Sequence, residues 1–83
     1  MTDSKMFEMI EGLKKRVKAL DGKGFCAIYQ QPTTISREAW VYGVRFGCKG
    51  HVIRFDRHPT VVACADDAWL VGKALDALEE EAK

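Results

Sequence analysis

Near the start of the chain, apolar residues recur at alternating spacings of four and three, which is the period of one helix face. They are Met6, Ile10, Leu13, Val17 and Leu20. A polar side chain at positions 2–4 can cap the first turn, and Gly22 and Gly24 can end the helix. The pattern predicts an amphipathic helix over residues 3–21.

The middle of the chain has a period of two instead. Residues 39–48 and 51–57 alternate large apolar residues with small or charged ones, which is typical of strands with one buried face. A two-residue loop at Lys49-Gly50 would join them into a hairpin that sets Phe46 opposite Ile53. A four-residue loop from Gly47 to Gly50 would change these partners but keep both faces. We expect the inner face to belong to the core and to carry Trp40, Tyr42, Val44, Phe46, Ile53 and Phe55.

Three further segments complete the predicted elements. Residues 25–30 are rich in strand formers and precede a loop over residues 32–37. Pro59 interrupts the third strand, and residues 60–64 either form a short fourth strand or extend the third past a bend. Residues 66–82 predict a second helix, with two aspartates in its first turn and an apolar stripe of Ala68, Val71, Leu75, Leu78 and Ala82.

These elements predict an α+β fold of two layers. The order is α-β-β-β(-β)-α, and a sheet with one apolar face is satisfied by packing both striped helices on that face. A chain of 83 residues has room for one hydrophobic core, so we expect a single domain over residues 1–83.

Charge and cysteine content narrow the classes of protein. The net charge is +1, but residues 1–59 carry a net +5 and residues 60–83 a net −4. Such segregation suits pairing between elements or with another molecule. No apolar run is long enough to span a membrane. The three cysteines, Cys26, Cys48 and Cys64, are unsuited to a disulfide scaffold, which favours a cytoplasmic location.

The order of one helix, three strands and a second helix resembles that of double-stranded-RNA-binding domains, over nearly the whole chain. In that family the second helix begins with lysines, which reach phosphates across a groove. The corresponding stretch here, residues 66–69, reads Asp-Asp-Ala-Trp. Two negative charges then stand where phosphate would lie, which argues against that mode of RNA binding.

A different nucleic-acid surface is still open to this chain. Lysines gather on the first helix, and arginines lie on the polar face of the hairpin. The candidate contacts are Lys14, Lys15, Lys18, Arg45, Lys49 and Arg54. Near-neutral domains also carry such residues as ordinary solvated faces.

Metal binding and catalysis have weaker support. Cys48 and His51 form a C-x-x-H at the hairpin tip, half of a zinc site, with no second pair at a familiar spacing. A hairpin tip also lacks the donor-lined pocket that a thiol nucleophile needs. There is no glycine-rich phosphate loop, so we expect neither an enzyme nor a cofactor.

The hypothesis that the sequence favours is a small non-enzymatic module for protein–protein interaction or regulation, of the kind found among phage and bacterial accessory proteins. The polar face of the hairpin, with Val41, Arg45, Val52 and Arg54, can receive a partner. Trp69 lies off the apolar stripe of the second helix and is either a contact residue or packed on a loop. A second copy is an alternative partner, through an edge strand such as residues 25–30 or through the open sheet face.

Overall fold

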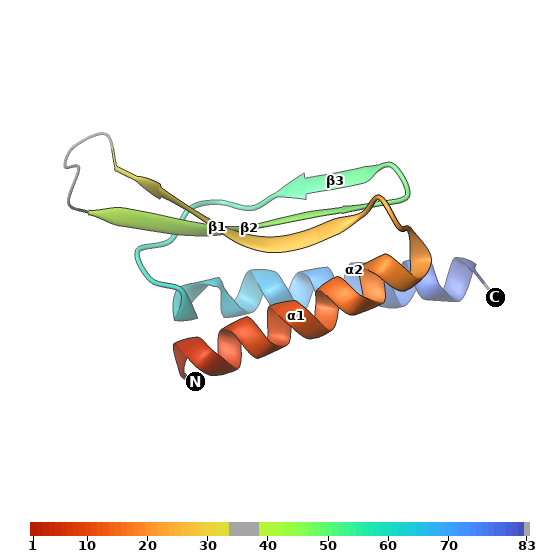
Figure 1. Ribbon diagram of the computed structural model, residues 1–83, viewed down its shortest axis with the longest axis horizontal. Helices are drawn as coiled ribbons and strands as arrows, with labels where there is room; N and C mark the ends of the chain where they lie inside the picture. The colour runs from red at the N-terminus through yellow and green to blue at the C-terminus, as the bar shows by residue number, and fades with distance from the viewer. Residues whose placement is uncertain (34–38, 83) are drawn as a thin grey trace.

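Two helices cover one face of a three-stranded antiparallel sheet, as Figure 1 shows. The computed structural model describes residues 1–33 and 39–82, so most of the predicted loop over 32–37 lies outside the described residues. The helices are α1 (Asp3–Leu20) and α2 (Ala65–Glu81), and the strands are β1 (Phe25–Pro32), β2 (Trp40–Cys48) and β3 (His51–Arg54). The predicted α+β class, with both helices on one side, is confirmed.

The first helix begins and ends where its sequence predicts. The Thr2 hydroxyl accepts the backbone N–H of Lys5 at 3.2 Å, which caps the first turn. At the other end the backbone N–H of Asp21 donates to the carbonyl of Val17 at 2.8 Å. The buried residues of α1 are four of the five in the predicted stripe: Met6, Ile10, Leu13 and Val17.

Of the two hairpin loops that the sequence allows, the structure has the two-residue one, with its register. Lys49 and Gly50 both have positive φ, 50° and 86°, as a tight turn between twisted antiparallel strands requires. Phe46 lies opposite Ile53, and Arg45 lies opposite Arg54. The strand order is β1-β2-β3, so β1 and β3 are both edge strands.

The third strand is shorter than predicted, and the segment after it is not a strand. Within the described residues, β3 ends at Arg54. Beyond it, the Phe55 N–H donates to the Val44 carbonyl at 3.0 Å, and an isolated bridge joins Tyr42 to His58. Pro59 has no N–H to continue the ladder, so the chain leaves the sheet there. Residues 60–64 contain a short 3-10 helix, Val62–Cys64, which leads into α2.

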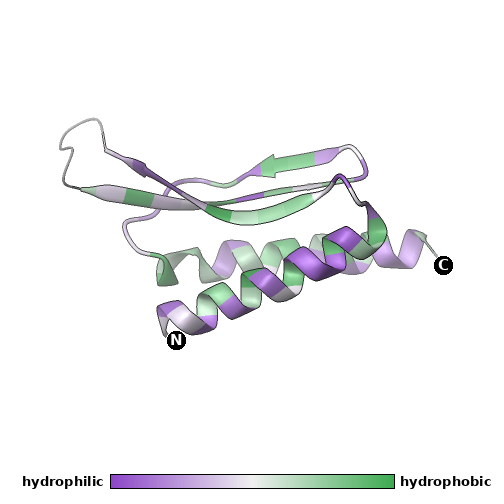
Figure 2. Cartoon of the chain, in the orientation of Figure 1, coloured by the Kyte–Doolittle hydropathy of each residue, from purple (hydrophilic) through white to green (hydrophobic). Residues whose placement is uncertain are grey.

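The core lies between the helices and the inner face of the sheet. Figure 2 shows apolar and polar bands alternating along both helices, as one buried face requires. Among the described residues, the largest fully buried side chains are Phe46, Met6, Leu75, Val17, Val44, Val71, Cys26, Cys48 and Cys64.

Two residues assigned to the core by alternation are more exposed than predicted. Trp40 and Ile53 retain 45% and 40% of their surface. Trp40 begins β2 at the end of the sheet that extends past the helices in Figure 1. Ile53 faces a groove of about 240 Å³ between β3 and α2, because α2 packs against β2 rather than the edge strand. The alternation of the sequence predicts on which face of the sheet a side chain lies. Whether that side chain is buried depends on how far the helices extend across the sheet.

Candidate functional site

The sheet face turned away from the helices is uncovered by any described element (Figure 1). We call it the outer face and define it by alternating residues of the three strands. It comprises Phe25, Ala27, Tyr29 and Gln31 of β1, Val41, Gly43, Arg45 and Gly47 of β2, and Val52 and Arg54 of β3.

Two aromatic rings of β1 lie across glycines of β2. Tyr29 pairs with Gly43, and Phe25 pairs with Gly47. A Cβ at Gly43 would lie 2.4 Å from the Tyr29 ring, and one at Gly47 would lie 2.5 Å from the Phe25 ring. Each ring therefore occupies the space that a side chain on β2 would fill.

The Tyr29 side chain crosses the whole of β2. Its hydroxyl donates to the carbonyl of Phe55, just after β3, at 3.1 Å. One end of the ring is thus anchored on β1 and the other beside β3. This hydrogen bond fixes the ring as a rigid, half-buried platform on the outer face.

The two arginines of the hairpin each lie over one of these rings. The guanidinium carbon of Arg54 is 4.7 Å from the centre of the Tyr29 ring, and that of Arg45 is 5.7 Å from the Phe25 ring. Attraction between a guanidinium and an aromatic face contributes about 0.5–1 kcal/mol at exposed sites. Arg45 and Arg54 lie opposite each other in the ladder, so attraction to the two rings offsets part of the repulsion between their like charges.

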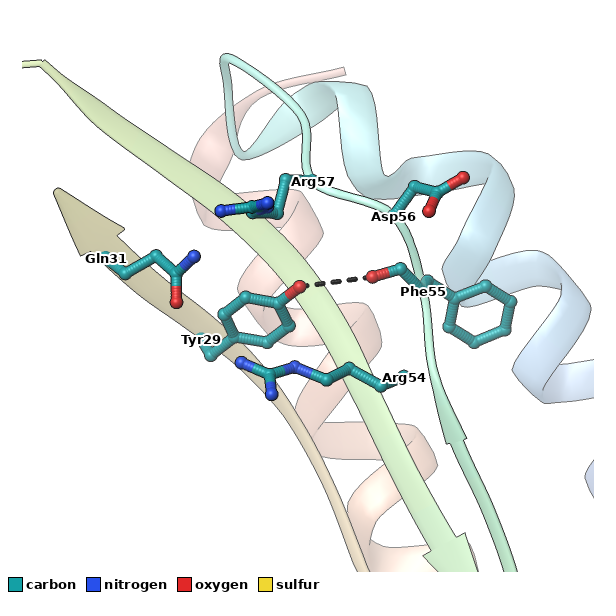
Figure 3. Close-up of a pocket in the computed structure, with 6 residues that line it drawn as sticks. All are labelled: Tyr29, Gln31, Arg54, Phe55, Asp56 and Arg57. Carbon is teal, nitrogen blue, oxygen red and sulfur yellow. Dashed lines mark hydrogen bonds between the residues drawn. The ribbon is translucent and has the colours of Figure 1, made fainter. Parts of the chain in front are cut away.

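A hollow of about 460 Å³ adjoins the Tyr29 platform. Its lining residues are Tyr29, Gln31, Arg54, Phe55, Asp56 and Arg57. Figure 3 shows the Arg54 and Arg57 guanidinium groups on opposite sides of the ring, with the Gln31 amide beside it. The Asp56 carboxylate points away from them, so hydrogen-bond donors dominate the hollow.

Three acids of α2 are paired with basic residues from other parts of the chain. Arg16 of α1 donates to Asp76 at 2.6 Å and also to Glu79, and these carboxylates raise the pKa of Arg16. Asp67 lies 2.7 Å from the imidazole of His58. The outer face as defined contains no acidic residue, so the two sides of the molecule differ in charge.

The predicted nucleic-acid contacts fall into separate places. Arg45 and Arg54 lie on the outer face, and Lys49 is in the hairpin turn. Lys14 and Lys18 join Arg45 along a second hollow of about 390 Å³ at the free side of β1. Lys15 is exposed on α1 and lines neither hollow.

The predicted protein-contact residues lie on two different surfaces. Val52 is 71% exposed and Val41 is half-buried, both on the outer face. Trp69 is 61% exposed on the helix layer, where the Lys73 ammonium lies 5.0 Å from its ring centre. Trp69 and the hairpin residues therefore do not form one site.

Sequence reasoning missed Phe25, Tyr29 and Gln31 as contact residues of the outer face, and Arg57 of the adjoining hollow. A usable signal was present in Gly43 and Gly47, because glycine inside a strand often marks the close approach of another group. The β1–β2 register decides which ring approaches each glycine. No two-residue turn joins β1 to β2, so turn geometry could not predict this register from the sequence.

The Cys48–His51 pair does not form a reactive or metal-binding centre with other described residues. Cys48 is buried and His51 is exposed, and no group of three potential metal ligands occurs in residues 1–33 and 39–82. Burial raises the pKa of the Cys48 thiol, and Asp21 adds to the effect. Burial also raises the pKa of Cys26 to about 11, so both thiols are protonated at neutral pH.

Comparison of the chain with protein-family models, curated proteins and solved structures finds no match. None of the helices within the described ranges is both long and apolar enough to cross a membrane. The candidate function therefore rests on the outer face and its chemistry.

Proposed function

We propose that this protein is a non-enzymatic binding module whose outer face takes single-stranded nucleic acid. The observation that carries the proposal is the stacking of Arg54 on Tyr29 beside a hollow that Arg57 also lines. Proteins that bind single strands without strong sequence preference combine aromatic platforms for the bases with cations that follow the phosphates. The outer face offers both on one rigid sheet.

The aromatic platforms and cations are arranged in alternation. Phe25 and Tyr29 are four residues apart on one strand, each with its own arginine. Residues four apart on a strand are separated by roughly 13 Å, a distance that two stacked bases joined by flexible backbone can span. Arg57 and Gln31 supply further donors at the end marked by Tyr29.

A duplex is a poorer fit to the same molecule. The first turn of α2 carries Asp66 and Asp67, and Asp67 is held by His58. These acids would repel phosphates at the helix terminus that double-stranded-RNA-binding domains use. Single-stranded nucleic acid on the opposite layer avoids that repulsion.

Charge-reversal variants can test whether the outer face, rather than another basic surface, binds the oligonucleotide. We expect Arg54→Glu to weaken binding of a fluorescein-labelled oligothymidylate by at least about tenfold in fluorescence anisotropy, because it removes a phosphate contact and a stacking partner. Lys15→Glu makes the same change in net charge outside both hollows and should change affinity less than about threefold. The unfolding free energy of Lys15→Glu should stay within about 0.5 kcal/mol of the parent, and that of Arg54→Glu within about 1 kcal/mol, the contribution of its contact with Tyr29.

The salt dependence provides the second readout. Binding through phosphate contacts weakens steeply as salt rises, since counterions compete for the same phosphates. Equal losses in Arg54→Glu and Lys15→Glu would indicate a non-specific charge effect and reject the outer face as the site. Absence of binding to oligothymidylate and oligouridylate at low salt would reject the function itself.

A protein partner is the second candidate, and the exposure of Trp69 favours it. Trp69 and its neighbour Leu70 retain 61% and 47% of their surface on α2. Large exposed aromatic residues are enriched among contacts that dominate protein interfaces. A partner that is retained at high salt and lost in Trp69→Ala, with oligonucleotide binding absent, would favour this function over the first.

A further inference from the structure

The free edge of β1 can be assigned residue by residue. In an antiparallel ladder the N–H and C=O of one residue point to the same neighbouring strand. Tyr42 exchanges hydrogen bonds with His58, and Val44 accepts from Phe55, so even-numbered residues of β2 bond toward β3. The odd-numbered residues of β2 therefore bond to β1. By the observed register, the β1 residues that face away from the sheet are Cys26, Ile28 and Gln30.

The two edges of the sheet differ in how they are protected. β3 is four residues long, contains His51 and Arg54, and is followed by Pro59. β1 is eight residues long and has no charged side chain. Natural sheets shield long edges with charges, prolines or covering elements, because unpaired backbone groups recruit another strand. β1 has a proline only at its last position, Pro32.

A hollow of about 390 Å³ runs along this edge between β1 and α1. Phe7, Glu11, Lys14 and Lys18 line it from α1, at spacings that place them on one side of the helix. Phe7 and Phe25, which also borders the hollow, retain 49% and 36% of their surface. The edge thus combines unpaired backbone with exposed aromatic rings.

We propose that two copies of this chain pair through β1, antiparallel about a two-fold axis at Ile28. The two Ile28 residues then exchange both of their backbone hydrogen bonds, as do Cys26 of each copy and Gln30 of the other. The result is a continuous six-stranded sheet with all four helices on one face, twice the three strands and two helices of one chain.

The charges of α1 favour a second copy as the occupant of this edge. The two-fold axis reverses the direction of one α1 relative to the other. The N-terminal half of each α1 therefore lies toward the C-terminal half of the other. The first half carries Glu8 and Glu11, and the second carries Lys14 and Lys18. Within one chain Glu11 and Lys14 already lie 4.0 Å apart, so both charges are present on the side that faces the hollow. A surface with this order of charges is complementary to itself under a two-fold rotation.

Analytical ultracentrifugation of the nucleic-acid-free protein, from about 10 µM to about 1 mM, tests the dimer by mass action. Gln30→Pro removes an outward N–H that has no partner in the described part of the sheet, and we expect it to raise the dissociation constant at least about tenfold. Gln30→Ala keeps that N–H and should leave the constant within about threefold. A monomer at every concentration overturns the proposal.

A second pair of variants covers the case in which proline disturbs β1. Phe7→Ser should weaken the dimer. Trp69→Ser should not, although Trp69, on the other helix, is an even more exposed aromatic residue. Backbone amides of Cys26, Ile28 and Gln30 should also become protected from hydrogen exchange as concentration rises. A dimer that leaves these amides unprotected, or that Trp69→Ser breaks instead, overturns the β1 assignment. The test involves no oligonucleotide, so its failure is distinct from failure of the proposed function.

Discussion

At the scale of single residues, Asp21 joins two distant turns. Its carboxylate accepts the backbone N–H of Lys49 at 2.8 Å, in the hairpin turn, and that of Lys23 at 3.0 Å, just after α1. These bonds, with Lys49 the larger cause, lower the pKa of Asp21. They exist in full only while the carboxylate is charged.

The lowered pKa predicts a pH dependence of stability. The contribution of Asp21 is complete above the ordinary aspartate pKa of about 3.9 and is lost as pH falls through the lower folded value. Asp21→Asn should therefore flatten the acid limb of stability measured by urea unfolding between about pH 2 and pH 6. Glu8→Gln on the exposed side of α1 is the control; an equal flattening there would contradict the assignment to Asp21.

At the scale of elements, the pairing of β1 with β2 depends on two glycines. Gly43 and Gly47 have no side chain, and the rings of Tyr29 and Phe25 fill the space above them. Gly43→Ala would place a methyl group 2.4 Å from the Tyr29 ring, so the ring must move. It would then give up its hydrogen bond to Phe55 and its contact with Arg54.

We expect Gly43→Ala to destabilise the fold by about 1 kcal/mol and to weaken oligonucleotide binding, because the platform is displaced. Gly12→Ala is the matched control. Gly12 lies within α1 with nothing within 4 Å of an added Cβ, so the same change there should stabilise by about 1 kcal/mol. In a Tyr29→Ala background the cost of Gly43→Ala should disappear, and a cost that persists would contradict the ring contact as its cause.

At the scale of the whole molecule, a single hydrophobic core contains all three cysteines. Cys26, Cys48 and Cys64 come from β1, β2 and the 3-10 helix and have exposed fractions of 2%, 2% and 0%. Burial raises the pKa of each of these thiols. Each is therefore both inaccessible and protonated at neutral pH.

This predicts that the thiols report unfolding of the whole domain. The reaction with Ellman's reagent at neutral pH should be slow for the native protein. The free energy of opening calculated from this rate should match the free energy of unfolding measured in urea. The free thiol of glutathione under the same conditions is the control for reagent activity. Rapid reaction of one thiol in the native protein would show that its element opens separately.

The periods of the sequence account for most of the fold. A four-three spacing predicts both helices and most of their buried stripes, and a period of two with a turn around Lys49-Gly50 predicts the hairpin and its two faces. These are local properties, because partners lie within a few residues or across a tight turn. The predicted core membership of Trp40 and Ile53 was wrong, since coverage by a helix is not a local property.

The sequence by itself thus determined the two layers, the inner and outer faces of the hairpin, and the position of Arg45 and Arg54 on its polar face. Only the tertiary structure decided what lies beside those arginines. The register of β1 on β2 spans a long connection, and it sets Phe25 and Tyr29 over Gly47 and Gly43. Because that pairing is non-local, no period along the chain encodes it. The polar face of the hairpin predicted from alternation becomes a candidate binding surface only through the strand that packs against it.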